Sequence, residues 1–416
     1  RSTLFPYTTL FRSRSKMLYT KENRILRTVI CCVSLLLCVE ISAQLQSYKL
    51  DFTLSKKHFA DTIRIKYENG QVLVPVDIDG QRYQFLLDTG ASQGGIFHNT
   101  KIKSSEAFGQ IRSSDGNNNK DTLQMVRIRK LTIGTLSVKD YRATVLRHSI
   151  VKNEKCDGIL GFDLVKKGLL MKIDARNGML ILTDLKHHFD ADKGNLLKFK
   201  KRLQTPYIEI TPFMGYSEQA LFDTGSRLFY SINRERFKKN EHKMVNRAQI
   251  EGRSFGCVTV GHMGAEAMDE VVLLSLESLC VGNFLLKDVH VFTSQTKSHL
   301  GAGILKYCSV TFNPHKGTVN FKPYDGVKSC VVGNKQIEKS IVPTKDRRPM
   351  VGFVWEKSEY YKAGFRAGDI LVAVDGSPLN SIEDYKQFLS RLIKNQFYTF
   401  TVNDKNGSRR IIKSRW

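Results

Sequence analysis

The 416-residue chain lacks the markers of several common protein classes. Outside the N-terminal segment, no apolar run approaches the roughly 20 residues that a helix needs to cross a bilayer. Eight cysteines are present without a C-x-x-C pair, and five, an odd number, follow Ala43, so neither a zinc site nor a disulfide framework is indicated. The adjacent His187 and His188 lack the H-E-x-x-H spacing of metalloproteases, and we expect no metal and no cofactor.

Acidic residues are scarce, since 40 Asp and Glu stand against 65 Lys and Arg and give a net charge of +25. The basic residues form short clusters without interleaved aromatic residues or a nucleic-acid-binding motif, so we expect no nucleic-acid partner. An anionic envelope surface is a partner that this charge would suit. The 41% share of hydrophobic residues excludes a wholly disordered chain.

The first 43 residues are not expected to belong to the fold. Residues 1–16 show no periodicity and resemble a translated adapter sequence, so we take Met17 as the start of the protein. A basic segment and the apolar stretch 28–37 follow, and Ile41-Ser42-Ala43 offers a cleavage site. Residues 17–43 therefore predict a signal peptide and a secreted or periplasmic protein. The alternative is that the apolar stretch is retained as an uncleaved anchor.

An internal repeat organises the middle of the chain. Residues 85–91 (FLLDTGA) and 220–226 (ALFDTGS) share an apolar strand that runs into Asp-Thr-Gly, and Asp88 and Asp223 lie 135 residues apart. The repeat predicts two similar lobes: residues 60–190 and residues 200–325.

Each triplet is followed by a second, glycine-containing apolar segment. These segments are 159–162 (ILGF) and 301–304 (GAGI), and their spacing from the triplets pairs Gly161 with Gly303. Short helices are expected after Gly161 and around Glu277.

The lobes are expected to consist mainly of β-strands. Residues 71–78 alternate between apolar and other side chains, and Asp79-Gly80 then turns the chain into the apolar segment 83–87, which is a hairpin signal. Two further segments show the same pattern: 131–146 and 284–292.

The two triplets and the later glycine segments resemble the two-part active-site signature of aspartic proteases of the pepsin and retropepsin type. In the second lobe, Gly301-Ala302-Gly303 departs from that signature by a glycine where a bulky apolar residue is usual. The resemblance implies a mostly β fold of two pseudo-symmetric lobes, endopeptidase activity, and a peptide or protein substrate.

The resemblance also implies that Asp88 and Asp223 are the catalytic pair. Hydrolysis of a peptide without a metal or a covalent intermediate needs one carboxylate to activate water and one carboxylic acid to polarise the carbonyl. Two carboxyl groups about 3 Å apart cannot both ionise and so share one proton, as aspartic proteases are known to do. Each lobe supplies one aspartate, so the lobes must meet at this pair.

Four neighbouring residues are expected, from the same resemblance, to support the pair. The hydroxyl groups of Thr89 and Thr224 would hydrogen-bond across the lobes and hold the loops rigid. Gly90 and Gly225 would let backbone N–H groups approach the carboxylates.

The residue after each triplet differs between the lobes. In this family a hydroxyl at that position commonly hydrogen-bonds the aspartate, so Ser226 would support Asp223, whereas Ala91 cannot support Asp88. A carboxylate without that donor is less stabilised when charged, which predicts activity that extends toward mildly acidic or neutral pH.

Two other interpretations are open. Residues 90–94 (GASQG) fit G-x-S-x-G, the nucleophile elbow of serine hydrolases, in which Ser92 would attack the substrate. That motif requires a strand, a sharp turn and a helix, and Gly94-Gly95 is a poor helix start. The other alternative is a non-catalytic peptide-binding protein on a protease fold, although the second intact Asp-Thr-Gly argues against a degenerate site.

The C-terminal segment predicts a separate α+β domain over residues 338–416. Residues 363–371 (AGFRAGDIL), followed by Val374-Asp375-Gly376, resemble the PDZ domains of bacterial envelope proteases. The resemblance implies a peptide ligand or recruitment of a protein. The groove is expected between a helix near 382–393 and a strand that carries the peptide-binding residues: Val351, Gly352, Phe353 and Val354.

Overall fold

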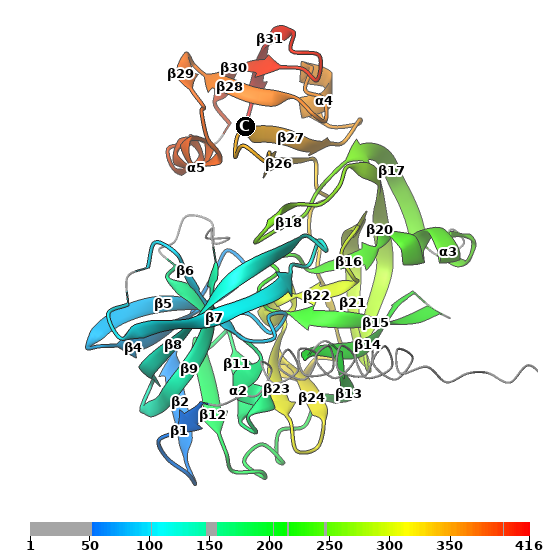
Figure 1. Ribbon diagram of the computed structural model, residues 1–416. Helices are drawn as coiled ribbons and strands as arrows, with labels where there is room; N and C mark the ends of the chain where they lie inside the picture. The colour runs from blue at the N-terminus through cyan, green and yellow to red at the C-terminus, as the bar shows by residue number, and fades with distance from the viewer. Residues whose placement is uncertain are drawn as a thin grey trace, which may run out of the picture. The chain divides into compact units, whose positions relative to one another are not determined.

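The computed structural model describes residues 52–100, 102–146, 156–202, 204–213, 216–244, 248–393 and 395–416. The adapter-like segment 1–16 and the expected signal peptide 17–43 lie outside these residues. In the described part, no helix is both long and apolar enough to cross a membrane. The described chain is mostly β-strand with a few short helices, which confirms the predicted fold class (Figure 1).

The first lobe contains one sheet, whose described strands are β1 (Thr53–Leu54), β3 (Lys66–Glu68), β4 (Gln71–Ile78), β5 (Gln81–Leu87), β6 (Gly94–Phe97), β7 (Ser105–Ser114), β8 (Lys120–Ile133), β9 (Leu136–Leu146) and β10 (Gly158–Leu160). Their order is β1-β9-β6-β10-β5-β4-β8-β7, with β3 beside β4. β4 and β5 form the predicted hairpin. Asp79 and Gly80 both have positive φ angles, 55° and 75°, as a two-residue type I′ turn requires.

A second sheet extends through both lobes. Six of its strands form the bridging part: β2 (Ala60–Arg64), β11 (Leu170–Asp174), β12 (Met179–Thr183), β13 (Asn195–Arg202), β23 (Cys308–Asn313) and β24 (Thr318–Pro323). The others belong to the second lobe: β14 (Thr205–Phe213), β15 (Tyr216–Asp223), β16 (Tyr230–Asn233), β17 (Ala248–Gly256), β20 (Asp269–Val281), β21 (Phe284–Ser294), β22 (His299–Gly301) and β25 (Ser329–Val331).

The pairing of β11 with β23 joins the lobes, with Met171 opposite Phe312. The full order is β17-β20-β21-β16-β22-β15-β14-β13-β24-β23-β11-β12-β2, with β25 beside β21. Backbone hydrogen bonds therefore run from one lobe into the other.

One of the two expected helices is present. The segment after Gly161 forms α2 (Asp163–Lys166), but the helix expected around Glu277 is wrong, because Glu277 lies in β20. The residues before it, 271–276, are almost all buried, and β20 pairs with β17 on one side and β21 on the other. A buried strand that is paired on both sides is a short apolar run, and periodicity alone does not distinguish such a run from a short buried helix. The other helical segments of the two lobes are α3 (Arg234–Met244), η1 (Ala302–Lys306) and η2 (Tyr324–Gly326).

One hydrophobic cluster extends through both lobes. The strands that precede the two Asp-Thr-Gly triplets contribute Phe85 and Phe222, both fully buried. Phe162 of the first lobe meets Phe312 of the second edge to face, with the ring centroids 5.1 Å apart. A shared core therefore fixes the two triplet loops relative to each other.

The C-terminal segment has its own sheet, helices and hydrophobic cluster. Its elements are β26 (Lys339–Pro343), β27 (Pro349–Val354), α4 (Glu359–Ala363), β28 (Ile370–Val374), β29 (Ser377–Pro378), α5 (Ile382–Ser390), β30 (Phe397–Asn403) and β31 (Arg409–Arg415). The strand order is β26-β27-β28-β30-β31, with β29 beside β28. A capping box begins α5, because Ser381 Oγ accepts the Asp384 N–H and the Asp384 carboxylate accepts the Ser381 N–H.

Candidate active site

Each predicted aspartate stands at the end of a buried strand that has a parallel neighbour. β5 pairs with β10, with Leu87 opposite Leu160, and β15 pairs with β22, with Asp223 opposite Gly301. The backbone N–H of Asp88 extends the first pairing by donating to the Leu160 carbonyl at 2.9 Å. The two strand ends thereby hold both Asp-Thr-Gly loops at the junction of the lobes.

The structure brings the two aspartates together, and the glycines of the triplets permit their approach. A Cβ added at Gly90 would lie 2.6 Å from Asp223 Oδ1, and one added at Gly225 would lie 2.6 Å from Asp88 Oδ2. These distances are too short for any side chain, so each loop requires glycine where the opposite carboxylate lies against it. Asp88 and Asp223 are therefore close enough for the ionisation of one to affect the other.

The threonines of the triplets cross-link the lobes. The Thr89 hydroxyl donates to the Phe222 carbonyl at 2.7 Å and accepts the Thr224 N–H at 3.0 Å. The Thr224 hydroxyl donates to the Leu87 carbonyl at 2.7 Å and accepts the Thr89 N–H at 3.0 Å. Both side chains are fully buried. The four bonds tie each loop to the strand of the other lobe.

The pair is arranged to share a proton. Desolvation and the neighbouring charge of Asp223 raise the pKa of Asp88 well above its ordinary value. Asp88 Oδ1 accepts the Ala91 N–H at 3.0 Å. Asp223 Oδ1 accepts the N–H groups of Gly225 at 2.9 Å and Ser226 at 3.3 Å. Ser226 thus reaches Asp223 through its backbone, as Ala91 reaches Asp88, and this contact does not distinguish the lobes.

The glycine of the second lobe that corresponds to Gly161 is Gly301, and the pairing with Gly303 expected from the sequence is wrong. A Cβ at Gly161 would strike the Gln93 backbone at 2.5 Å, and one at Gly301 would strike the Leu228 carbonyl oxygen at 2.1 Å. Gln93 and Leu228 each stand five residues after the aspartate of their lobe. The error arose because η1 begins directly after Gly301 and places a second glycine in the same run.

The corrected register identifies a site residue that the sequence analysis missed. With Gly301 in the place of Gly161, His299 stands where the first lobe has Ile159. His299 Nε2 lies 3.7 Å from Asp223 Oδ2, and the side chain is buried. Only the register of β22 against β15 reveals this position, so no local sequence signal could have found it.

Two turns from different lobes meet each other. The 115–119 tip joins β7 to β8, and the 260–265 tip comprises β18 (Val260–Gly261), β19 (Gly264–Ala265) and the turn between them. Asp115, 7% exposed, shapes the first tip because its Oδ1 accepts the N–H groups of Asn117 and Asn119.

Hydrogen bonds join the two tips. Asn117 Nδ2 donates to the carbonyl oxygens of Thr259 and Gly264 at 3.3 and 3.1 Å, and the Thr259 hydroxyl donates to Asn117 Oδ1 at 2.9 Å. The Met263 N–H donates to Asp115 Oδ2 at 3.1 Å. The two lobes are thus linked at the tips as well as at the triplets.

Met263 places the 260–265 tip against the first lobe. It packs on the hydrophobic cluster of that lobe that includes Leu123 and Ile159. Neither tip was predicted from the sequence. Runs of turn-forming residues at 115–119 (DGNNN) and 261–264 (GHMG) are the sequence features that indicate these turns.

The serine-hydrolase alternative is wrong. After Ser92 the chain enters a strand, β6, which pairs with β10 and β9. A nucleophile elbow needs a helix at that point, because the helix N-terminus and the sharp turn together expose the serine. The residues that suggested the elbow belong instead to the loop around Asp88.

The residues expected to bind a peptide in the C-terminal segment lie on a strand that is already paired. β27 carries Val351, Gly352, Phe353 and Val354, and it pairs along its length with β26. Their side chains are buried, and the Gly352 carbonyl accepts the N–H of Cys257 from the second lobe at 2.8 Å. The edge strands of this sheet are β26 and β31. The helix residues Tyr385, Phe388 and Leu389 pack on the local hydrophobic cluster.

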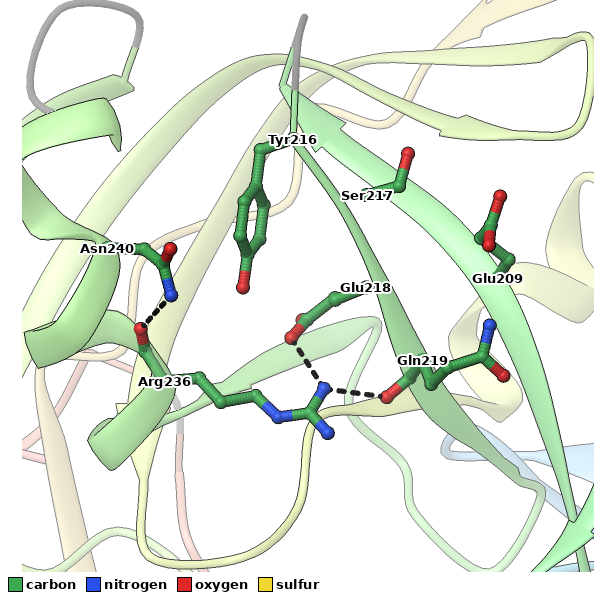
Figure 2. A pocket seen from close by; sticks show the side chains of 7 residues that line it. All are labelled: Glu209, Tyr216, Ser217, Glu218, Gln219, Arg236 and Asn240. Atoms are coloured by element: carbon green, nitrogen blue, oxygen red, sulfur yellow. Dashed lines mark hydrogen bonds and ion pairs between the residues drawn. The ribbon is translucent and has the colours of Figure 1, made fainter.

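A separate pocket of about 320 Å³ lies between β15 and α3 (Figure 2). Arg236 Nη1 donates to Glu218 Oε2 at 3.1 Å and to the Gln219 carbonyl at 3.0 Å (Figure 2). Neither Asp88 nor Asp223 lines it, and its Arg236 is paired with Glu218. Among the described residues, no group of three or more His, Cys, Asp or Glu side chains could hold a metal ion.

Comparison with known proteins agrees with the geometry of the first lobe. Residues 74–164 match the aspartyl protease family model, and this segment contains Asp88 and Gly161. No curated protein matches the chain. Among solved structures, the chain is similar to the aspartic proteinase from Irpex lacteus, with 14% identity and a TM-score of 0.44 over 64% of this chain and 98% of that one.

Proposed function

Because residues 74–164 carry an aspartyl protease domain, we propose that the protein is an aspartic endopeptidase in which Asp88 and Asp223 hydrolyse peptide bonds of a peptide or protein substrate. The observation that carries the proposal is the meeting of the two carboxyl groups through Gly90 and Gly225. Two aspartates distant in sequence, cross-linked by buried threonines and sharing one proton, fit the requirement for one general base and one general acid.

The proposed reaction uses the two carboxyl groups in opposite protonation states. One carboxylate takes a proton from water, whose oxygen attacks the carbonyl carbon, while the other carboxyl group gives its proton to the carbonyl oxygen. In the second step the C–N bond breaks. The nitrogen takes the proton held by the first carboxyl group. One hydroxyl of the tetrahedral diol formed in the first step returns a proton to the second carboxyl group. The products are a carboxylic acid and an amine, and the pair regains its starting state.

The two tips form the proposed cover of the substrate cleft. Met263 and Ala91 of the Asp88 loop pack on one hydrophobic cluster of the first lobe, and we infer that an extended peptide passes beneath the 115–119 and 260–265 tips to reach the aspartates. We infer that the hydrogen bonds of Asn117 and Asp115 break and reform during substrate entry.

The C-terminal segment is proposed to act as a PDZ-type module that binds a peptide ligand or recruits a protein. Strand addition at the β26 edge supports this role, because edge strands offer unpaired backbone groups to an extended peptide. A secreted or periplasmic location, with an anionic envelope surface as a further partner, rests on the N-terminal sequence and the net charge.

The function is tested with purified chain beginning at Gln44 and a denatured protein as substrate. Cleavage that a statine-type inhibitor abolishes is expected, because the inhibitor's hydroxyl imitates the tetrahedral intermediate between the two carboxyl groups. Binding of the same substrate without cleavage, at every pH from acidic to neutral, would instead support the non-catalytic peptide-binding alternative.

A further inference from the structure

A buried chain of polar side chains ends at Asp223. Ser294 Oγ and Thr296 Oγ1 lie 2.7 Å apart, and Thr296 Oγ1 lies 3.2 Å from His299 Nδ1. On the other side of the imidazole ring, Nε2 is 3.7 Å from Asp223 Oδ2. Ser294, Thr296 and His299 are 0%, 6% and 8% exposed. The polar chain therefore runs through the interior of the second lobe to one carboxyl group of the candidate pair.

Packing alone does not explain a histidine at this place. The equivalent residue of the first lobe is Ile159, which is 5% exposed and lies in a hydrophobic cluster. A buried imidazole loses its hydration, and that cost is offset only where polar partners replace water. The second lobe supplies such partners on both ring nitrogens, whereas the first lobe fills the same position with an apolar side chain.

The contact between Thr296 and His299 permits either tautomer of the neutral ring. With the Thr296 hydroxyl donating to Nδ1, the proton of neutral imidazole lies on Nε2 and points toward Asp223. A separation of 3.7 Å is longer than a direct hydrogen bond, but the N–H dipole still acts on the carboxylate in an interior shielded from water.

Among the described residues, two charged groups act directly on the ring: Asp223 and Lys297. Asp223 on β15 faces Nε2, with Asp88 beyond it, and Lys297 lies in the loop before β22. From β16, the neutral Ser231 pairs with His299 through the backbone. Burial lowers the pKa of His299. The Asp223 charge and a hydrogen bond to the Lys297 backbone oppose that shift, and the Lys297 charge adds to it.

We propose that His299 is a positioning residue that makes Asp223 the ionised member of the pair and leaves Asp88 as the member that carries the proton. The proposal rests on the endopeptidase function stated above and assigns the two roles within it. Asp223 is then the base that takes the proton of water, and Asp88 is the acid that protonates the carbonyl. The difference between the two aspartates was first expected from Ser226. In this proposal it comes from His299, 76 positions after Asp223.

The pH dependence of kcat/KM tests the role in catalysis. Replacing His299 with the residue of the first lobe, His299→Ile, removes the donor that favours the Asp223 carboxylate. The acid limb of the profile should move to higher pH by about half to one unit, the size expected for loss of one hydrogen-bond-like interaction. His299→Gln, which keeps an N–H donor, should shift the limb less, and the control His290→Gln should not shift it. An unmoved acid limb in His299→Ile, with the wild type active, overturns the proposal and leaves the function intact.

A titration of His299 by NMR tests the assignment even in a preparation that cleaves nothing. Asp223→Asn removes the charge that supports protonated imidazole, so the pKa of His299 should fall. Asp88→Asn replaces a carboxyl group that is already neutral, so the pKa of His299 should stay near its wild-type value. A fall in Asp88→Asn with no change in Asp223→Asn would reverse the roles and contradict the proposal. An inactive wild type would count against the proposed function alone.

Discussion

At the scale of single residues, the candidate site depends on two glycines that leave room for the opposite carboxyl group. Gly225→Ala would place a Cβ 2.5 Å from Asp88 Cγ, so the two carboxyl groups must move apart. We expect a loss of roughly 100-fold or more in kcat, because catalysis tolerates little displacement of reacting groups. Gly109→Ala is the matched control, since a Cβ there meets nothing within 4 Å. Equal activity of the two variants would contradict this account of the site.

The threonine cross-link predicts a loss of stability. Thr224→Val leaves the buried Thr89 N–H and Leu87 carbonyl without their partner. The free energy of unfolding should fall by about 2–5 kcal/mol, measured by chemical denaturation, because each unpaired buried backbone group costs about 1–3 kcal/mol. Thr224→Ser keeps the hydroxyl and should lose much less. A similar loss in both variants would assign the effect to packing of the methyl group.

The raised pKa of Asp88 predicts a dependence of stability on pH. The folded chain keeps this proton where the unfolded chain, with an ordinary pKa near about 4, has released it. Wild-type stability therefore falls as pH rises from about 4 through the folded pKa, since the folded state binds more protons there. Asp88→Asn lacks this effect, so its stability relative to the wild type should increase with pH.

Denaturation midpoints of the wild type and Asp88→Asn at a series of pH values would measure this trend. Asp140→Asn, a change at an exposed aspartate, serves as the control and should show no comparable trend. A constant difference between Asp88→Asn and the wild type at all pH values would contradict the shared-proton arrangement.

The sequence was informative about residues whose role is local. Asp88 and Asp223 were identified because an Asp-Thr-Gly loop after an apolar strand is a contiguous signal. His299 and Gly301 were not, because their positions depend on the register of β22 beside β15, and a shift of two residues changes which side chain faces the carboxylate.

At the scale of elements, the two tips couple the lobes to each other. Asn117→Ala removes two donated bonds and one accepted bond between the tips but leaves the Asp115 turn intact. Hydrogen exchange should become faster in both tips, at 115–119 and 259–265, because they form one network. Ser114→Ala, an exposed change beside the first tip, should leave exchange unchanged. Faster exchange in the first tip alone would show that the tips are independent.

Hairpins were predictable, but the pairing of hairpins with one another was not. β4 and β5 followed from alternation and the Asp79-Gly80 turn, which are local. The β11–β23 pairing joins residues 171 and 312, and no local pattern specifies such a partner. The same limit applies to the C-terminal segment, since the sequence identifies β27 as a buried strand but does not tell an inner strand from an edge strand.

At the scale of the whole described chain, the C-terminal segment is expected to stabilise the second lobe. Phe353 of β27 is fully buried in a cluster with Val271, Leu273 and Phe292. A chain that ends after Ile337 keeps β25 beside β21 but uncovers this cluster. Its thermal midpoint should fall by several degrees, since burial of one such side chain contributes about 2–3 kcal/mol. Phe353→Ala in the full chain should change the midpoint in the same direction, and an unchanged midpoint in both would mean that the contact does not stabilise the lobe.

The central claim is that two carboxyl groups, one from each lobe, act together on a peptide bond. The most direct test measures initial rates of cleavage of a denatured protein by the purified chain from Gln44 and by its Asp88→Asn and Asp223→Asn variants, with circular dichroism as the check on folding. The account predicts that each folded variant loses roughly 1,000-fold or more of the wild-type rate, because the general acid or the general base is missing. Wild-type cleavage retained by either folded variant would contradict it.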